Sequence, residues 1–339
     1  MGSGTYNCRV NADTLSSEAV CAIGREELLF RAGNRTFTVN YADVKDFRLL
    51  NYHLFIETSG GKVEVSKLGL QTEDFFDKLW EAYNARCLNA LFVEDGPLFT
   101  GEGDYAYTEQ GEEERHGIAK ITLHSDCLCM LPHNSGARRI PLCFSQEPET
   151  EQFKISLKLD TGEQYRISRI GRDTEAVFGK MCAARTKVVR KWKAAHDELS
   201  AHLPERLCER ADEYQQMEAV GCRMICGLYS LDDTGFWFAG IKEGKAAIEL
   251  VTNEQTATYL YTFNTSDTEF EQALRHAMES AGKHREVIFT DLADKPLYRM
   301  TVERSRALRF LRAHNAGRII HSGGWSERLK EFLNNAGNQ

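Results

Sequence analysis

One segment of the sequence occurs twice at a fixed distance along the chain. Val65-Ser66-Lys67-Leu68-Gly69 has a counterpart in Ile167-Ser168-Arg169-Ile170-Gly171, so the two final glycines are separated by 171 − 69 = 102 residues. The same offset of 102 relates Phe76 to Phe178. Because solenoid units are only a few dozen residues long, a repeat of this length predicts a duplicated domain.

Each copy has strand-like sequence before the repeated segment and helix-like sequence after it. Lys62-Val63-Glu64-Val65 alternates charged with apolar residues, as a half-buried strand does. After Thr72, a candidate helix N-cap, apolar residues recur at three- and four-residue spacing and predict an amphipathic helix. Its apolar stripe is Phe75, Phe76, Leu79, Trp80 and Tyr83. The stripe of the second copy is Val177, Met181, Ala184, Val188 and Trp192, and we expect its helix to end near Pro204.

Several strands, a hairpin and one amphipathic helix, present twice, resemble the pleckstrin-homology-like (PH-like) superfold, including its bacterial, GRAM-type and GLUE-type members. The residues that carry the resemblance are 60–83 and 162–181, with the strand-turn-strand segments 28–44 and 127–144 before them. The resemblance implies a bent seven-stranded sheet in each copy, closed at one end by the helix. On this basis we expect Phe76, Trp80, Phe178 and Met181 to be buried under their barrels.

The predicted fold class is α+β, with two PH-like barrels followed by a smaller domain with an antiparallel sheet. The predicted domains are residues 1–95, 96–203 and 204–339. In the last domain we expect strands near residues 223–231, 235–241, 246–252, 256–263, 287–290 and 318–321. Helices are expected at 269–280, led by the capping candidate Ser266, and at 298–314. This domain is either a distinct α+β fold or a decayed third copy of the repeat.

Composition limits the classes of function. The formal net charge of −8 argues against a general nucleic-acid binder, because phosphate binding needs an excess of Lys and Arg. No apolar run approaches the ~20 residues that span a bilayer, and the start resembles no targeting leader. The ten cysteines are predicted to be buried thiols, with Cys127 and Cys129 on one side of a strand. These features predict a cytoplasmic protein.

No catalytic, metal-binding or cofactor-binding motif is evident. His276, His284, His314 and His321 lie in the last domain, with Ser322 beside the fourth. Catalysis needs a geometry that proximity in sequence does not supply, and a strand leaving into a glycine turn explains His321-Ser322-Gly323-Gly324 equally well. We therefore expect a protein that is not an enzyme and holds neither a metal nor a cofactor.

The candidate partner-binding residues lie on the second helix and on one strand of the last domain. They are Lys187, Arg190, Lys191, Trp192, Lys193 and Trp237. The cations suit an anionic partner or a lipid headgroup, although a solvated helix face is the alternative. Trp192 lies beyond the length that a barrel cap requires and should be buried at a junction between domains or subunits. Trp237 belongs to an aromatic run that a partner, a neighbouring domain or a helix of its own domain must cover.

The predicted function is that of a non-enzymatic interaction or scaffold protein with a protein partner. Peripheral binding to anionic lipid is one alternative, although residues 11–18 and 101–117, the candidate headgroup loops, hold no basic cluster. We expect no appreciable phosphoinositide affinity. An enzyme housed in the last domain is the second alternative, and a second copy of the chain is the alternative partner.

Overall fold

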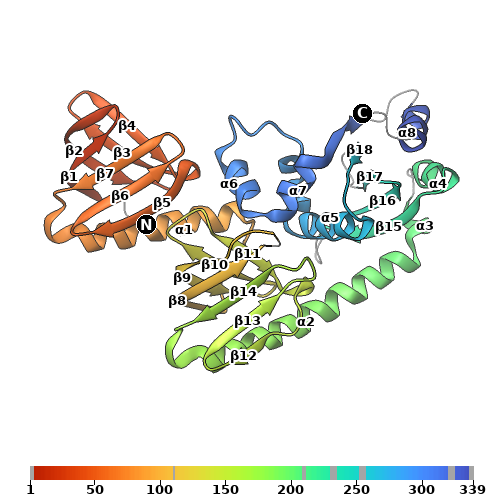
Figure 1. Cartoon of the computed structure of the whole chain (residues 1–339), viewed down its shortest axis with the longest axis horizontal. Helices are drawn as coiled ribbons and strands as arrows, with labels where there is room; N and C mark the ends of the chain where they lie inside the picture. The colour runs from red at the N-terminus through yellow and green to blue at the C-terminus, as the bar shows by residue number, and fades with distance from the viewer. Residues whose placement is uncertain are drawn as a thin grey trace.

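The computed structural model describes residues 4–109, 111–207, 211–229, 235–251, 257–319 and 325–335. Its first unit is a curled antiparallel sheet closed by a helix (Figure 1). The strands are β1 (Thr5–Ala12), β2 (Leu15–Ile23), β3 (Glu27–Ala32), β4 (Arg35–Asn40), β5 (Val44–Leu50), β6 (His53–Thr58) and β7 (Gly61–Ser66). Two short 3-10 turns, η1 (Tyr41–Asp43) and η2 (Gly69–Gln71), precede β5 and the helix α1 (Thr72–Ala90).

The second unit repeats this plan strand for strand. Its elements are β8 (Phe99–Thr108), β9 (Arg115–Leu123), β10 (Cys127–Pro132), β11 (Arg138–Pro141), η3 (Leu142–Phe144), β12 (Glu149–Glu151), β13 (Lys154–Lys158), β14 (Gln164–Ser168), η4 (Gly171–Asp173) and α2 (Thr174–Ala201). The first sheet has the order β4-β3-β2-β1-β7-β6-β5, and the second has the order β11-β10-β9-β8-β14-β13-β12. Adding seven to each strand number of the first sheet gives the second, so the predicted duplication is confirmed. Curled seven-stranded sheets followed by a helix fit PH-like domains.

The repeated sequence segment forms the corner between the last strand and the helix. Lys67 and Arg169 have left-handed backbones, with φ of 60° and 58°, and the glycines two residues later are also left-handed. Only glycine takes this conformation without a steric cost, which accounts for a glycine at the same place in both copies. Thr72 is not the N-cap that we predicted. It is the first residue of α1, and its hydroxyl donates to the carbonyl oxygen of Gly69 over 2.8 Å.

The C-terminal domain is a five-stranded antiparallel sheet with helices on both faces. Its strands are β15 (Arg223–Leu228), β16 (Phe236–Lys242), β17 (Lys245–Val251), β18 (Ala257–Thr262) and β19 (Asn315–Ile319), paired in that order. Its helices are α3 (Leu203–Arg206), α4 (Ala211–Ala219), α5 (Asp267–Ala281), α6 (Pro296–Arg304), α7 (Arg306–His314), α8 (Trp325–Asn334) and the 3-10 segment η6 (Gly282–Ile288). This strand order differs from that of the two units. The third copy and the exact domain boundaries stay predictions.

Two predicted elements of this domain are wrong. Residues 287–290 are not a strand: η6 covers Gly282–Ile288, and apolar runs as short as Val287-Ile288-Phe289 do not distinguish a buried strand from a buried helical turn. The helix predicted at 298–314 is two helices, because Ser305 has an extended backbone and caps α7 by accepting from the Leu308 N–H. By contrast, Ser266 caps α5 as predicted, accepting from the Glu269 N–H over 3.2 Å.

Strand β10 joins the cores of the two units. Cys127, Cys129 and Leu131 pack into the core of the first unit, while Leu128 and Met130 pack into the core of the second. The strand is therefore buried on both faces, and the two cysteines face the same side as predicted. Six of the nine described cysteines are buried and three are half-buried, which confirms most of the predicted burial; Cys208 lies outside the described residues.

The helix stripes are only partly covered by their own barrels. Phe75 and Leu79 are fully buried in the first unit, and Met181 is fully buried in the second, as predicted. Trp80 is buried as well, but between the units: its Nε1 donates to the Leu131 carbonyl over 3.2 Å, and its ring lies 3.9 Å from that of His133. Phe76 and Phe178 are only half-buried. The predicted burial is therefore confirmed for Met181 and Trp80, although Trp80 is covered in part by the second unit, and it is wrong for Phe76 and Phe178.

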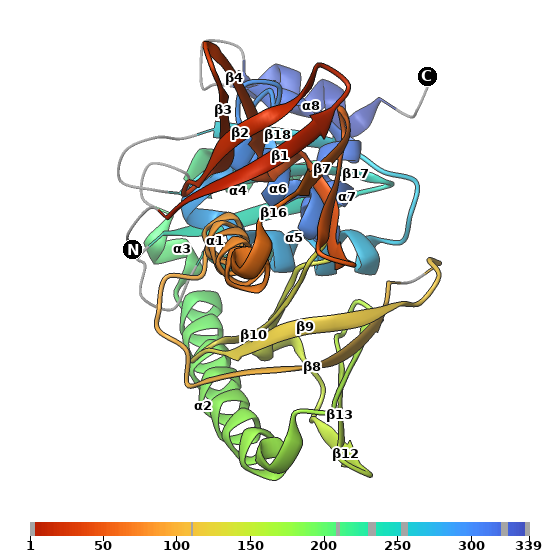
Figure 2. The same cartoon turned by 90° about the vertical axis from the view of Figure 1, so that its left-hand side faces the viewer.

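The C-terminal domain is hydrogen-bonded to both units, and in Figure 2 it lies behind the first unit and above the second. Thr301 of α6 donates to the carbonyl of Ala90 over 2.7 Å, and Arg304 donates to the Tyr83 hydroxyl over 2.8 Å. On the second unit, Arg139 binds Glu279 of α5 through two bonds of 2.6 and 2.8 Å. Since hydrogen-bonded charged pairs of this kind are geometrically specific, they fix the relative orientation of the domains.

Candidate interaction sites

Each unit carries an exposed aromatic side chain at the tip of its second-last hairpin. In the first unit the β5–β6 turn is Asn51-Tyr52, with φ of 50° and 63°. In the second unit the β12–β13 turn is Gln152-Phe153, with φ of 49° and 62°. Tyr52 is 72% exposed and Phe153 is 71% exposed. Two copies of one turn therefore hold a large ring in water in the same strained conformation.

This arrangement is unfavourable for a bare structural turn. Two-residue hairpin turns with positive φ at both positions prefer Asn-Gly or Asp-Gly, because bulky residues avoid the left-handed region. The cost is about 1–2 kcal/mol for each such residue. Neither Tyr52 nor Phe153 stands out in the sequence, since aromatic residues there are typical of strands. The tips also differ by 153 − 52 = 101 residues, one fewer than the repeat of the helix corner.

The predicted basic face of α2 is exposed. Lys187, Arg190 and Lys191 lie on the outside of the helix, and none of them forms an ion pair with a described residue. Lys193 pairs with Asp197 over 2.6 Å, one turn further along. The structure therefore brings the predicted cations together on one helix, and their role in binding a partner stays a prediction.

The two predicted tryptophans lie in different environments. Trp192 is half-buried between the second unit and the C-terminal domain: its ring meets that of Phe144 at 5.8 Å and packs on the core around Leu199 and Phe238. This is the junction that we predicted. Trp237 is only 1% exposed, in the core between the sheet and α5. A helix of its own domain covers it, so the ring offers no surface to a partner.

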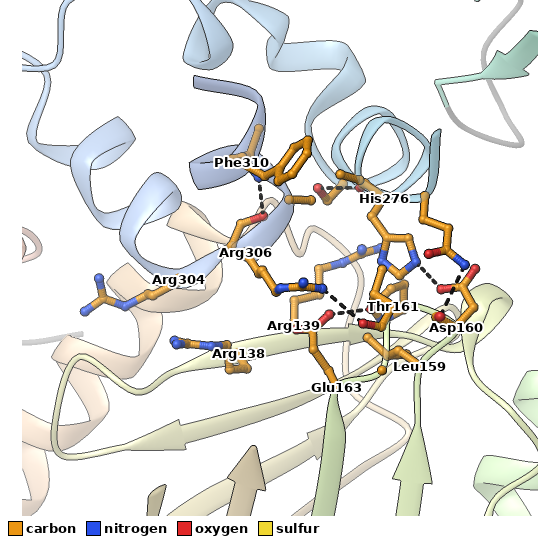
Figure 3. A pocket seen from close by; sticks show the side chains of 18 of the residues that line it. Arg138, Arg139, Leu159, Asp160, Thr161, Glu163, His276, Arg304, Arg306 and Phe310 are labelled. Carbon is orange, nitrogen blue, oxygen red and sulfur yellow. Dashed lines mark hydrogen bonds and ion pairs between the residues drawn. The ribbon is translucent and has the colours of Figure 1, made fainter. Parts of the chain in front are cut away.

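A cavity of about 500 Å³ lies at the junction of the second unit and the C-terminal domain (Figure 3). From the second unit, the β13–β14 turn enters it with Asp160 and Thr161; from the C-terminal domain, His276 and Arg306 point down at that turn. His276 Nε2 lies 2.6 Å from Asp160 Oδ1, and Arg306 donates to the Thr161 carbonyl over 3.0 Å. The polar groups at the turn are thus already engaged with one another, and they join the two domains.

A buried carboxylate near this junction holds two guanidinium groups. Arg138 Nε donates to Glu109 over 2.8 Å, and Arg309 of α7 binds the other oxygen of Glu109. Burial by itself raises the pKa of this carboxyl, but Arg138 and Arg309 outweigh that effect and hold the pKa below its usual value. Glu109 is therefore a charged link between the first hairpin of the second unit and the C-terminal domain.

The described histidines of the last domain do not form one site. His276 stacks on Phe144 at 4.3 Å, His284 on Phe92 at 4.3 Å and His314 on Phe310 at 4.2 Å. No hydroxyl or thiol of the described residues is hydrogen-bonded to the imidazole of His276. His321 and Ser322 lie outside the described residues.

The described part of the chain holds no group of three or more His, Cys, Asp or Glu side chains placed to bind a metal ion. Among its helices, none combines the length and apolarity needed to cross a membrane.

No protein-family profile matches the sequence, and no curated protein matches it significantly. Among solved structures, the C-terminal domain of an unknown protein from Leishmania infantum aligns with 15% identity over 24% of this chain and 81% of that one, with a TM-score of 0.21. The Spt16D Pob3N heterodimer aligns with 12% identity over 48% of this chain and 88% of that one, also with a TM-score of 0.21. Neither similarity is close enough to assign a family or a function.

Proposed function

We propose that the protein is a non-enzymatic, cytoplasmic interaction scaffold that binds a protein partner through the aromatic tips of its two PH-like units. The observation that carries this proposal is the duplication of the tips, Tyr52 and Phe153, each exposed and each on a left-handed backbone. Strain of this kind persists where function requires it, and aromatic residues are the side chains most enriched at protein interfaces. Kinship with the bacterial PH-like domains remains part of the proposal.

The rigid junctions support a scaffold. Trp80, Arg139 and Arg304 join the three domains through buried or half-buried contacts. Because these contacts fix the domains relative to one another, the tips keep a constant separation and orientation. When a partner contacts both tips, the scaffold therefore loses little conformational entropy on binding.

The test is a double variant, Tyr52→Gly with Phe153→Gly. Glycine accepts the left-handed backbone, so the free energy of unfolding should stay the same or rise by up to about 1 kcal/mol. The matched control is Asn51→Gly with Gln152→Gly, which changes the same turns and keeps both rings. In quantitative capture experiments from a lysate of the source cell, the wild type and the control should bind a common set of proteins. The ring variant should fail to bind that set. If both variants capture the same proteins as the wild type, the tips do not bind a partner.

Peripheral binding to anionic membranes is the competing function, because the exposed Lys187, Arg190 and Lys191 on α2 would suit a lipid headgroup. We expect no such binding, since the β1–β2 turn holds Asp13 and the β8–β9 turn holds Glu112, Glu113 and Glu114. Co-sedimentation with anionic liposomes distinguishes the two functions. Salt-sensitive binding that is lost when the three α2 cations are reversed would favour the membrane.

A further inference from the structure

The outer face of the first unit carries a groove of about 480 Å³, here called the β5–β7 groove. It crosses β1, β5, β6 and β7 on the side of the sheet away from the core. Its charged and aromatic lining is Asp13, Asp46, Arg48, Phe55, Glu57, Lys62 and Glu64. Beside it, Leu50 is 58% exposed and Phe55 is 37% exposed, next to the Tyr52 tip.

The strand register arranges the lining in two rows across the sheet. One row pairs Arg48 with Phe55, and Phe55 with Glu64. The other row pairs Asp46 with Glu57, and Glu57 with Lys62. Asp46 and Glu57 are thus like charges directly opposite each other on neighbouring strands, an arrangement that destabilises a sheet. The β-bulge between Val44 and Asp46 sets this register, and bulges commonly re-aim a side chain at a functional place.

The charged side chains of the groove have a net negative charge. Four carboxylates line it against Arg48 and Lys62, a difference of 4 − 2 = 2 negative charges. Glu64 has His53 as a partner at 2.5 Å, but Asp46 and Glu57 form no ion pair with any described residue. Partial burial, and then the nearby Glu57, raise the pKa of Asp46 despite the opposing effect of Arg48. A cation in the groove would relieve this repulsion.

The adjoining strand edge is already used for pairing. β5 is the last strand of its sheet, and its outer side pairs with the second unit: the Phe47 N–H donates to the His133 carbonyl, and the Ser135 N–H donates to the Lys45 carbonyl, each over 3.0 Å. Because backbone groups alternate sides along a strand, Leu49 presents its N–H and C=O on the same outer side. No described strand pairs with it there.

We propose that the β5 edge at Leu49 and the β5–β7 groove bind an extended cationic segment of a partner protein, in which Lys or Arg alternates with apolar residues. The backbone of the segment would pair with Leu49 as an added strand. Its cations would meet Asp46 and Glu57, and its apolar residues would cover Leu50 and Phe55. Charge complementarity and continuity with the existing pairing at Lys45 and Phe47 favour this occupant. The inference rests on the proposed function and names the class of partner for the first tip.

The test uses the whole chain and a fluorescein-labelled peptide that alternates lysine with valine, followed by fluorescence anisotropy. The variant is Asp46→Asn with Glu57→Gln. Neither carboxylate forms an ion pair with a residue that the structure describes, so the variant should fold normally. The control is Glu149→Gln with Glu151→Gln, two exposed acids of β12 in the second unit, which changes the net charge equally. We expect the groove variant to bind roughly tenfold more weakly and the control to bind like the wild type.

Two further peptides define the chemistry. Replacing lysine by glutamate should abolish binding, and methylating the backbone nitrogens should weaken it, because a methylated nitrogen cannot donate to the Leu49 carbonyl. Equal binding by the groove variant, an equal loss in the control, or equal binding of the glutamate peptide would each overturn the inference.

The occupant can also be a second copy of this chain, whose α2 face carries Lys187, Arg190 and Lys191. In that case light scattering would show self-association of the wild type and none of the groove variant. This outcome would overturn the proposal that the segment belongs to another protein. The proposed function has its own test in Tyr52 and Phe153. If a protein captured from the lysate requires those rings but the lysine peptide does not bind, the proposed function stands. Only the inference of a cationic segment is then wrong.

Discussion

The two PH-like units share a strand order but use their closing helices differently. α1 has 19 residues, and its Trp80 leaves the barrel to contact β10 of the second unit. The matching position of α2 is 80 + 102 = 182, where Cys182 is a half-buried thiol. α2 instead has 28 residues and extends to the C-terminal domain (Figure 1), where Trp192 packs on the core around Leu199 and Phe238. Both units have the same fold. The helix residues that lie outside each barrel determine which neighbouring domain that unit contacts.

The two sheets also differ in whether their edge strand pairs with a neighbouring domain. The outer edge of β5 pairs with residues 133–135 of the second unit, whereas the corresponding edge strand β12 is exposed throughout. Glu149 and Glu151 place charge on β12, a common protection against unwanted strand pairing. β5 carries Leu49 and Leu50 at the equivalent stretch. The first unit thus has an edge suited to pairing, and the second has an edge protected against it.

The largest expected difference in stability between the units comes from substitutions in the first hairpin of each. Glu109 in the second unit links Arg138 to Arg309, and the change Glu109→Gln leaves two guanidinium groups without their shared carboxylate. Breaking a buried pair in this way should cost about 3–5 kcal/mol in the free energy of unfolding. Asp13→Asn, in the corresponding turn of the first unit, changes an exposed carboxylate and should cost little. Urea unfolding of both variants measures the difference, and equal midpoints would contradict it.

The second test compares the matched helix positions. Trp80→Ala removes a buried indole and its hydrogen bond to Leu131, and should cost about 3 kcal/mol. Cys182→Ala removes only a half-buried thiol and should cost less than about 1 kcal/mol. Thermal unfolding of the two variants checks this. If Trp80→Ala is as stable as the wild type, the contact between the units contributes little to stability.

The duplication and most of the secondary structure could be predicted because they depend on local sequence. A glycine at the strand-to-helix corner, apolar stripes such as Phe75 with Leu79, and the cap Ser266 each express a local preference. The destination of Trp80 could not be predicted in the same way. An apolar stripe shows that a surface is buried, but it does not show which body covers it.

The candidate sites were harder to predict because they depend on tertiary arrangement or break local rules. Tyr52 and Phe153 occupy turn positions that favour glycine, so no turn rule indicated them. The β5–β7 groove combines Asp46, Glu57 and Lys62 from three strands, and their meeting depends on the strand register and on a bulge. The basic residues of α2 could be predicted, since a helix brings nearby residues to one face.

A third test concerns the longer second helix. Trp192→Glu places a charge between Phe144 and the C-terminal domain and should weaken that junction by about 2 kcal/mol. We expect faster proteolysis between residues 200 and 220, with the first unit left intact. The control is Lys191→Glu, which places the same charge on the exposed side of the helix. Cleavage at the wild-type rate would mean that the far end of α2 is not needed for the junction.

The smallest expected effect is a pH dependence of the contact between the units. The His133 ring lies among Phe47, Phe76 and Trp80, and burial, with a smaller effect of Lys120, lowers its pKa to about 4. In the unfolded chain a histidine titrates near its usual value of about 6.5. The stability that the neutral His133 ring contributes is therefore fully present above about pH 6.5. It is lost as the pH falls towards the folded pKa, because the unfolded state binds the proton first.

Between about pH 7 and pH 5, allowing for solvent screening of a half-buried ring, this histidine should account for about 1 kcal/mol of the free energy of unfolding. His133→Gln removes the titration, so its stability should fall less over the same range. The control is His53→Gln, which changes the exposed histidine beside the tip of the first unit. Unfolding midpoints measured across this range compare the three proteins. If the His133→Gln curve runs parallel to the wild type while the His53→Gln curve flattens, the acid-sensitive contact lies at the tip and not between the units.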